Sequence, residues 1–416
     1  MSFKSLFSIL SILTLCFAPP HSRAAELTIS KAIAEALAHN PEMRSLEASV
    51  ASAKGGVTTA RTYSNPELSI APGIKHTSDS GVSKSEFHGN FELSRLFEFP
   101  GKRALKIAIA EKNVALQQLA LEGFRFELSA KVRRAFYEML AAQKIAGLRN
   151  EQAGSAKTFV ESAKKRAESG YASDFETMKS QADLIAAQRE LLESQGKIAA
   201  ARAAINTLLG RSPSAALEVS GSLENLAPQA VSAGDFVSLA MARNPSLRTL
   251  GMQAESAGLN LKAARFGRRP DFAIGPQVEY TRDEQIYGVG VTVALPFLDQ
   301  KKGEIATATA EQQKALAEIE KTRLEITGEV VKSADALRIA REQLALYTPS
   351  FLDGLKAFVA QAEQSYAQSA TTLIIYLDAR RTYFDTLAQY YESLGSVAEH
   401  RAELESAVGV PLDLKP

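Results

Sequence analysis

Two stretches of this chain nearly repeat each other: "AHNPEMRSL" at residues 38–46 and "ARNPSLRTL" at residues 242–250, which begin 204 positions apart. Beyond them the same residues recur in pairs, without a gap: Ala60-Arg61 and Ala264-Arg265, Pro66 and Pro270, Ile70 and Ile274. Near the end of each copy, "TLLG" at Gly210 is matched by "SAVG" at Gly409. This spacing far exceeds the roughly 20–50 residues of a solenoid repeat. We interpret it as a duplication of one half of the protein.

The duplication divides the mature chain into two structural repeats, which we place at residues 25–226 and 227–416. Each repeat contains a segment in which apolar and polar residues alternate. A very long Ala-rich helical segment follows, then a break and a second long helical segment. The small differences in length between the repeats are expected to fall in loops.

The alternating segments come in pairs. In the first repeat they are "PELSIAPGIKHT" and "EFHGNFELSRLFEF", and in the second they are "PDFAIGPQVEYTR" and "QIYGVGVTVALPF". A period of two predicts β-strands, and the polar loops "SDSGVSKS" and "DEQ" would join each pair into a hairpin. We therefore expect hairpins at about residues 66–97 and 270–297, with strands of roughly ten residues, the length that crosses a bilayer when tilted.

Prolines flank both predicted hairpins, at Pro66 and Pro100 in the first repeat and at Pro270 and Pro296 in the second. Proline cannot donate a hydrogen bond to a strand ladder or continue the interior of a helix. Because the four prolines recur at matched positions, we predict that they mark the change between helix and strand. The alternative is that they are ordinary loop prolines.

Long helical segments follow each hairpin, at about residues 102–169 and 174–209 in the first repeat and 303–365 and 372–408 in the second. In the first of these, apolar residues recur at spacings of three and four, which is typical of a heptad seam: Leu121, Phe124, Leu128, Val132, Ala135 and Met139. About 65 residues at 1.5 Å each give a rod of ~100 Å. The pattern predicts long antiparallel coiled coils.

Four strands are too few to close a transmembrane barrel, because small barrels need about eight. An open sheet in lipid would leave the hydrogen-bonding groups of its edges unsatisfied. The chain is therefore expected to share one barrel with copies of itself. Two copies would give about eight strands around a filled interior, and three would give about twelve around an aqueous bore. The predicted fold class is a mixed α+β membrane protein whose rods continue the barrel as a helical tube.

Residues 1–24 are expected to be an export signal. Lys4 precedes the apolar run "LFSILSILTLCFA", which is too short to span a bilayer comfortably, and we place the cleavage after Ala24. Cys16, the only cysteine, lies in this segment and would be removed with it. Lipidation of Cys16 is the alternative, although Leu15 occupies a position where a small residue is preferred. The mature chain would then form no disulfide.

Composition and motifs exclude several classes of function. A formal net charge of +1 gives no electrostatic basis for nucleic-acid binding. The histidines show no metal-ligand spacing; His76 and His88 lie on opposite strands of one predicted hairpin, where a metal contact is an alternative to ordinary surface histidines. We find no glycine-rich phosphate loop and no nucleophile elbow. We expect no enzyme activity, no cofactor and no tight metal site.

The sequence resembles the TolC-type outer membrane efflux proteins over essentially the whole mature chain. The resemblance is carried by Asn-Pro after an Ala-rich helix in each repeat (Asn40-Pro41 and Asn244-Pro245), by the hairpin prolines, by "ALPFLDQKKGEIATATAE" from Ala294 and by "YLDARRTYFDTLAQ" from Tyr376. The stretch "FEFPGKRALKIAIAE" from Phe97 further resembles the subgroup that serves cobalt–zinc–cadmium pumps.

The resemblance implies a homotrimer with a twelve-stranded β-barrel in the outer membrane of a Gram-negative cell and an α-helical barrel in the periplasm. It implies a passive exit duct of a tripartite efflux system. The implied partners are outer membrane lipid, a periplasmic adaptor (membrane fusion) protein and an inner-membrane RND-type transporter. Heavy-metal cations are the expected cargo. A duct for organic compounds, a periplasmic coiled-coil scaffold and a soluble exported enzyme are the alternatives.

In this family the periplasmic end is narrowed near the turn between the long helices of the second repeat. Matched through "YAQSATTLIIYLDA", the resemblance places the family tyrosine at Tyr366 and one aperture aspartate at Asp378. Ile375 stands where a second aspartate often occurs, and Thr371 where an arginine can occur, so a double acidic ring latched by arginine is in doubt. Three copies of Asp378 would favour cations. Alternatively, Asp378 faces solvent outside the tube.

The turns between the long helices are small and polar. They consist of Gly170, Tyr171, Ala172 and Ser173 in the first repeat and of Ser369, Ala370, Thr371 and Thr372 in the second. Small residues suit a tight helical hairpin, and they also suit close contact with the helices of another protein. We therefore take these residues as candidates for contact with the adaptor.

Overall fold

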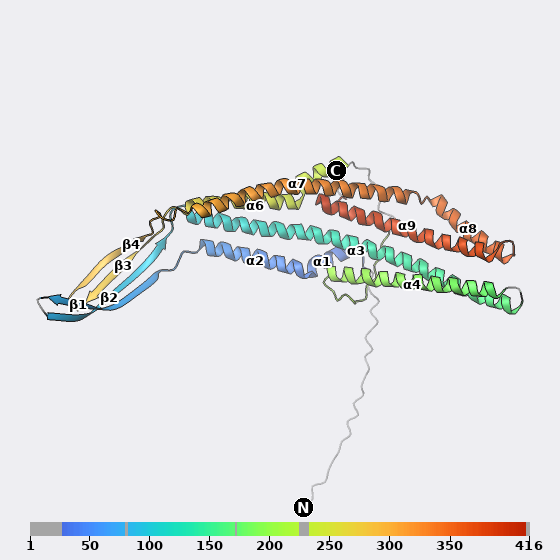
Figure 1. The fold of residues 1–416 in the computed structure, drawn as a ribbon, viewed down its shortest axis with the longest axis horizontal. Coiled ribbons are helices and arrows are strands. Elements are labelled where there is room, and N and C mark those ends of the chain that lie inside the picture. The colour runs from blue at the N-terminus through green and yellow to red at the C-terminus, as the bar shows by residue number, and fades with distance from the viewer. Residues whose placement is uncertain (1–26, 80–81, 171–172, 224–232, 413–416) are drawn as a thin grey trace, which may run out of the picture.

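The computed structural model describes residues 27–79, 82–170, 173–223 and 233–412 of the chain. The molecule is an elongated rod, with strands at one end and helices that run lengthwise to the other (Figure 1). The first repeat contains α1 (Ile29–His39), α2 (Pro41–Arg61), β1 (Glu67–Asp79), β2 (Val82–Phe97), α3 (Lys102–Glu168) and α4 (Asp174–Leu208). The second contains α5 (Ala233–Arg243), α6 (Pro245–Phe266), β3 (Phe272–Thr281), β4 (Gln285–Val293), α7 (Lys302–Ala345), α8 (Pro349–Ala367) and α9 (Leu373–Val408).

The repeated Asn-Pro dipeptide begins α2 in the first repeat and α6 in the second. Proline takes the first helical turn, where its missing N–H leaves no hydrogen bond unmade. The Asn40 side chain accepts a hydrogen bond from the amide two residues on, at 2.9 Å, and donates one to the carbonyl of Leu208, at 3.0 Å. Asn244 makes the same pair of bonds, at 2.9 Å and, to the carbonyl of Ala407, at 3.0 Å. Each asparagine therefore caps one helix and ties it to the end of the last helix of its own repeat.

A glycine in the left-handed conformation stands beside each of these contacts, with φ of 73° at Gly210 and 83° at Gly409. A Cβ on Gly210 would lie 2.6 Å from the carbonyl oxygen of His39, and one on Gly409 would lie 2.6 Å from Cδ of Pro245. Only glycine accommodates both the backbone conformation and the close approach. The duplicated sequence thus encodes a duplicated junction between helices.

The four strands form one antiparallel sheet in the order β1-β2-β3-β4. The two predicted hairpins are present, and β2 also pairs with β3, so the sheet joins the two repeats. At 13 and 16 residues, β1 and β2 are longer than predicted. The reason is that they extend into "SDSGVSKS", which the sequence analysis assigned to a loop. The outer strands of the sheet are β1 and β4.

The polypeptide changes between helix and strand at four places. At one of them the Asp271 carboxylate accepts a hydrogen bond from the amide of Phe99 at 2.7 Å and pairs with the Lys102 ammonium at 2.9 Å. These contacts hold the start of β3 against the end of β2. A proline lies at every changeover: Pro66 between α2 and β1, Pro100 between β2 and α3, Pro270 between α6 and β3, and Pro296 between β4 and α7.

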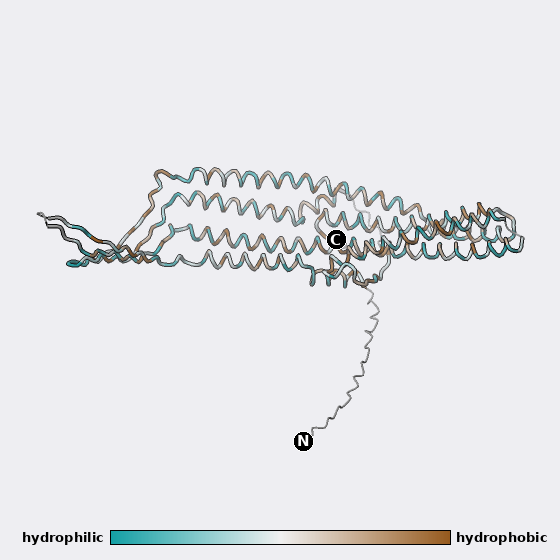
Figure 2. Tube along the Cα trace, turned by 60° about the horizontal axis from the view of Figure 1, so that its bottom comes forward, coloured by the Kyte–Doolittle hydropathy of each residue, from teal (hydrophilic) through white to brown (hydrophobic). Residues whose placement is uncertain are grey.

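The central helix is α3, which packs against α1, α2, α4, α6 and α9. Four residues of its predicted heptad seam are buried in the main apolar core: Leu128, Val132, Ala135 and Met139. The Glu127–Lys131 ion pair, at 2.6 Å, lies on the exposed side. Along the helices, apolar and polar residues alternate over short distances (Figure 2). In the described part of the chain, none of the helices combines the length and the apolar character that crossing a membrane requires.

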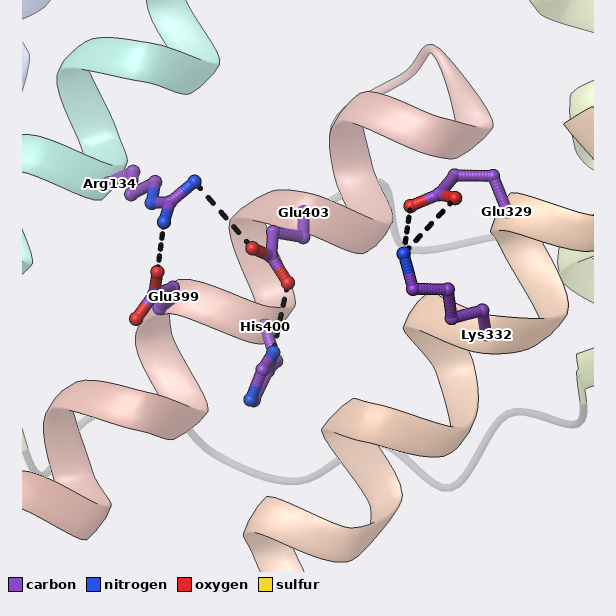
Figure 3. A network of polar contacts seen from close by, with 6 residues as sticks. All are labelled: Arg134, Glu329, Lys332, Glu399, His400 and Glu403. Atoms are coloured by element: carbon purple, nitrogen blue, oxygen red, sulfur yellow. Dashed lines mark hydrogen bonds and ion pairs between the residues drawn. The ribbon is translucent and has the colours of Figure 1, made fainter.

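Ion pairs join α3 of the first repeat to α9 of the second (Figure 3). Arg134 on α3 pairs with Glu399 and, at 3.6 Å, with Glu403, both on α9. Nearby, the Glu405 carboxylate is 2% exposed and lies 3.5 Å from the Arg133 guanidinium. Arg401, on α9 itself, lies 3.4 Å from the same carboxylate, so the buried charge is shared by two cations and the Arg133 contact adds a link between α9 and α3.

The second repeat departs from the prediction at residues 346–348. The sequence predicted one helix over residues 303–365, but α7 ends at Ala345 and α8 begins at Pro349. The Thr348 hydroxyl caps α8 by accepting a hydrogen bond from the amide of Phe351 at 3.2 Å. Proline within a helix clashes with the carbonyl four residues earlier and lacks an N–H, which the prediction did not take into account. The expected single rod is therefore two helices.

Candidate aperture at the helical end

Both turns between long helices lie at the end of the rod opposite the sheet (Figure 1). In the first repeat Gly170 follows α3 with a left-handed φ of 75°. In the second, Ser369 follows α8 with a φ of 58°, and the amide of Ala370 donates to the carbonyl of Ser365 at 2.8 Å. The left-handed residue reverses the chain in each case, so that each helix returns beside the one before it.

The residues that we considered for contact with an adaptor occupy these turns. Ser173 is the N-cap of α4, and its hydroxyl accepts a hydrogen bond from the amide of the third residue along, at 3.3 Å. Thr372 is the N-cap of α9, and Thr371 before it is half-buried. Tyr171 and Ala172 lie outside the described residues.

Three aromatic rings gather just behind the turns. Tyr366 on α8 and Tyr376 on α9 are stacked, with ring centroids 5.6 Å apart and planes 9° from parallel. Phe159 on α3 lies 5.6 Å from the first ring and 5.2 Å from the second. Both tyrosines are buried, and Leu373 and Leu377 complete the cluster. Because Phe159 belongs to the first repeat, the cluster joins the two helical hairpins.

Beside the rings, a buried arginine connects the same two hairpins. Arg380 on α9 is 4% exposed, and its guanidinium forms an ion pair with Asp183 on α4. The guanidinium also lies 5.7 Å from the ring centroids of Phe159 and Tyr376, within range of cation–π attraction. This pair was not predicted from the sequence. Its two residues are 197 positions apart, and neither is set off from the many other charged residues of its helix.

The environment of the two tyrosines disfavours ionisation of their phenols. Burial raises the pKa of Tyr366, and the negative charge of Glu176 raises it further. Burial likewise raises the pKa of Tyr376, although the neighbouring Arg380 acts in the opposite direction. A tyrosine is already protonated at neutral pH, so the raised pKa values only extend the neutral range upward, and no charge develops inside the cluster.

The predicted aperture residues on α9 face away from this cluster. Asp378 is exposed, as are Ile374 and Ile375, which are 57% and 56% exposed. Positions 374, 375 and 378 share one face of a helix, since residues three and four apart are neighbours on its surface. Of the candidates named from the sequence, Tyr366 thus lies inside the protomer, whereas Asp378 and Ile375 lie together on its surface.

A second polar junction lies further from the turns. The Arg149 guanidinium on α3 contacts Glu190 on α4 and Asp385 on α9, both at 3.0 Å. Together with the Arg380–Asp183 pair, it spans the two hairpins. These ion pairs therefore suit a structural role, in which they hold the two helical hairpins together. Among the residues that the structure describes, there is no group of three or more His, Cys, Asp or Glu side chains placed to hold a metal ion.

The fold defines a class of protein: a duplicated chain that places a four-stranded sheet at one end of a long helical rod. The chain belongs to the outer membrane efflux protein family, whose model matches residues 32–211 and 236–410. It is an outer membrane efflux channel with the TolC-type fold. Channels of this family work in tripartite systems with an adaptor and an inner-membrane transporter.

Individual relatives support the same assignment. The chain is 23% identical over 392 residues to the cobalt-zinc-cadmium resistance protein CzcC of Cupriavidus metallidurans, covering 94% of this chain and 92% of the relative. It is 24% identical to the nickel-cobalt-cadmium resistance protein NccC of Alcaligenes xylosoxydans xylosoxydans, over 70% of this chain and 66% of the relative. A crystal structure of CusC superimposes with a TM-score of 0.74 at 15% identity, covering 93% of each chain.

Proposed function

We propose that three copies of this chain form an exit duct that carries heavy-metal cations out through the outer membrane. The observation that carries the proposal is the sheet, whose outer strands β1 and β4 each have a partner on only one side within the chain. In lipid those free edges must be paired, and neighbouring copies can pair them. Three copies give about twelve strands, enough for an aqueous bore.

The choice of heavy-metal cations as cargo is supported by the relatives. CzcC, which matches this chain almost end to end, is named for resistance to cobalt, zinc and cadmium. NccC is named for resistance to nickel, cobalt and cadmium. A duct that passes metal needs no tight metal site, since strong binding would slow release. The second candidate is a duct for organic compounds, which the same fold would serve.

We place the narrowest point of the tube at the exposed face of α9 that carries Asp378 and Ile375. Three copies of Asp378 at one level would lower the energy of a cation there and raise that of an anion. Ile375 and the half-buried Thr371 would narrow the opening without adding charge. Tyr366 would act indirectly, by holding α8 and α9 against α3.

The partners follow from the two ends of the rod. Outer membrane lipid would surround the sheet, while a periplasmic adaptor protein would meet the helical turns, Gly170 to Ser173 and Ser369 to Thr372. An inner-membrane RND-type transporter would supply the energy, and the duct itself would act passively, without catalysis. Small residues at the turns favour this contact, because helices of a partner could approach the backbone closely.

The proposal is tested in a strain that lacks this protein. We expect the strain to lose tolerance of zinc, cobalt or cadmium, and to regain it when the chain is restored. The protein should need detergent for extraction and should run as a compact oligomer when it is not boiled. If the strain becomes sensitive only to detergents and antibiotics, the metal cargo is wrong and the organic-compound duct is correct.

A charge-neutral variant sharpens this test. Asp378→Asn removes the proposed acidic ring and should lower metal tolerance while leaving the amount of oligomer in the outer membrane unchanged. Asp353→Asn, at an exposed carboxylate on α8, makes the same chemical change elsewhere on the second hairpin and should behave as wild type. Equal loss in both variants would contradict the aperture role of Asp378.

A further inference from the structure

The two faces of the sheet differ in chemistry. Residues directly opposite each other in the ladder share a face, so the register assigns every side chain. On one face, apolar residues of β1 lie opposite apolar residues of β2: Leu68 and Leu93, Ile70 and Phe91, Ile74 and Phe87. The face continues across the sheet, with Val278 of β3 opposite Tyr287 of β4. Apart from the half-buried Val278, these side chains are largely exposed in the single chain, which is what contact with lipid requires.

The opposite face is polar along the two central strands. Side chains of β2 lie opposite side chains of β3 in three successive pairs: Glu92 and Gln277, Asn90 and Glu279, His88 and Thr281. Because lipid covers the apolar face, the polar face is the one that lines the bore in a closed barrel. Two of the carboxylates on this face, Glu92 and Glu279, therefore lie at neighbouring levels of the bore. The same face also carries Glu67 and, opposite each other, Lys75 and Glu86.

Several of the residues beside these polar side chains are small. A Cβ on Gly290 of β4 would lie 3.1 Å from the Glu92 carboxylate, so the glycine accommodates that side chain. On β1, the residues opposite Asn90 and His88 are the small Ala71 and Gly73. Glu92, Asn90 and His88 thus have small residues beside them, whereas the β4 residue opposite Glu279 is the larger Ile286.

Some polar atoms on this face of the sheet make no hydrogen bond. The Oδ1 atom of Asn90 and the Nδ1 atom of His88 are buried and have no hydrogen-bond partner. The nearest approach of His88 to an acid is 3.7 Å, to the Glu279 carboxylate, which is itself 41% exposed. The cluster therefore keeps free acceptor capacity on the polar face of the sheet.

We propose that Glu92 and Glu279 determine the charge selectivity of the exit bore, so that it passes cations in preference to anions. The inference rests on the proposed function, because only assembly of several copies turns this face into a pore wall. Rings of carboxylates select cations, and low-dielectric walls focus their field in the water between them. The bore would then repeat, at its exit, the preference proposed for Asp378 at its entrance.

The test is a measurement of reversal potential with the detergent-purified full-length oligomer in a planar lipid bilayer under a potassium chloride gradient. Wild-type channels are expected to favour potassium over chloride. In the double variant Glu92→Gln/Glu279→Gln, the cation-to-anion permeability ratio should fall severalfold toward one. Glutamine keeps the size and polarity of the side chain, and migration as an unboiled oligomer verifies that the variant is assembled.

Two further variants separate the possible results. Glu284→Gln removes one carboxylate from the connection between β3 and β4, outside the paired strands, and should leave the ratio close to wild type. Asp378→Asn reports on the helical end. If Asp378→Asn abolishes selectivity while the double variant keeps the wild-type ratio, the inference is wrong and the duct remains. If the wild-type oligomer forms no channels at all, the proposed function fails and the inference fails with it.

Discussion

The two repeats follow one plan, but their long helices lie in different surroundings. The first long helix, α3, runs unbroken for 67 residues through the centre of the molecule and has buried residues in successive turns from Leu128 to Ala163. Its counterpart is divided into α7 and α8, of 44 and 19 residues, at one side of the molecule. The duplicated sequence therefore produced one central helix and one divided, peripheral helix.

The two long helices also differ in where their apolar side chains find contacts. The large apolar side chains of α3 are buried or half-buried within the chain. Several on α7 and α8 stay exposed, with exposed fractions of 53% for Leu316, 76% for Leu324, 47% for Phe351 and 51% for Phe358. In the proposed trimer such residues would meet a neighbouring copy. Within the protomer α3 thus provides the scaffold, whereas α7 and α8 offer apolar contacts outside it. The second long helix of the first repeat, α4, does so too, through Phe175, Met178, Ile185 and Leu192. The contacts that cross between the repeats decide how firmly the second hairpin is held.

The largest effect is expected where the hairpins of the two repeats are joined by a buried ion pair. Asp183→Ala would leave the buried Arg380 guanidinium without its carboxylate. Removing one partner of a buried pair costs roughly 3–5 kcal/mol, and the partial exposure of Asp183 favours the lower value. We expect a loss of about 3 kcal/mol in the free energy of unfolding, together with faster proteolysis of the helical end.

A surface pair on the same scaffold is the matched control for this prediction. Glu127→Ala removes the carboxylate of an exposed i,i+4 pair with Lys131 and should cost only about 0.3–0.5 kcal/mol. Both variants are compared by denaturant titration of the detergent-solubilised protein. Equal small losses would show that the Arg380–Asp183 contact does not hold the hairpins together.

The next effect tests whether the two junctions are equivalent. Gly210→Ala and Gly409→Ala each place a Cβ in the left-handed region and against a neighbouring atom at 2.6 Å. The backbone conformation alone costs roughly 1–3 kcal/mol for a non-glycine residue. We expect similar losses in the two variants. A loss at one position only would mean that the repeats no longer share this junction as a structural requirement. As a control, Gly147→Ala on α3 should be neutral or stabilising, because nothing lies within 4 Å of its added Cβ.

A smaller effect is expected at the asparagines that cap α2 and α6. Asn40→Ala and Asn244→Ala should each cost about 1 kcal/mol, the usual value for a lost N-cap. Each also gives up the second hydrogen bond, to Leu208 or Ala407. Asn→Asp at the same positions keeps the acceptor that caps the helix but loses the donor, and so separates the two roles. If the aspartate variants match wild type in denaturant titrations, the tie to the last helix contributes nothing.

Much of the fold could be predicted because its signals are local. The Asn-Pro repeat, the alternation of the strands and the heptad seam of α3 all appear within short windows of sequence. The pairing of β2 with β3, with Arg95 opposite Ile274, could not be predicted in the same way. It joins segments far apart in the sequence, and no turn sets its register. The division at Pro349 was predictable in principle, since proline ends helices, but helical periodicity on both sides obscured it.

The same distinction between local and distant signals applies to the candidate aperture. Tyr366 and Asp378 were named from a motif that lies within one segment, and that motif does not tell which of them is buried. The Arg380–Asp183 pair has no counterpart in any short window, because each residue is one of many charged residues on a long helix. Chains with many alternating charges do not reveal which pair is buried until the helices are placed together.

The smallest effect is expected at Pro349, where the two repeats differ most visibly. Pro349→Ala removes the restriction on the unfolded chain and should cost about 0.4–1 kcal/mol. Two other features favour the division of α7 from α8: the Thr348 cap and the contact between the rings of Tyr347 and Tyr390, at 5.8 Å. We therefore expect the bend to persist, with an unchanged distance between spin labels at Lys332 and Lys356. A longer distance in Pro349→Ala, but not in the control Gly354→Ala within α8, would show that proline alone imposes the difference between the repeats.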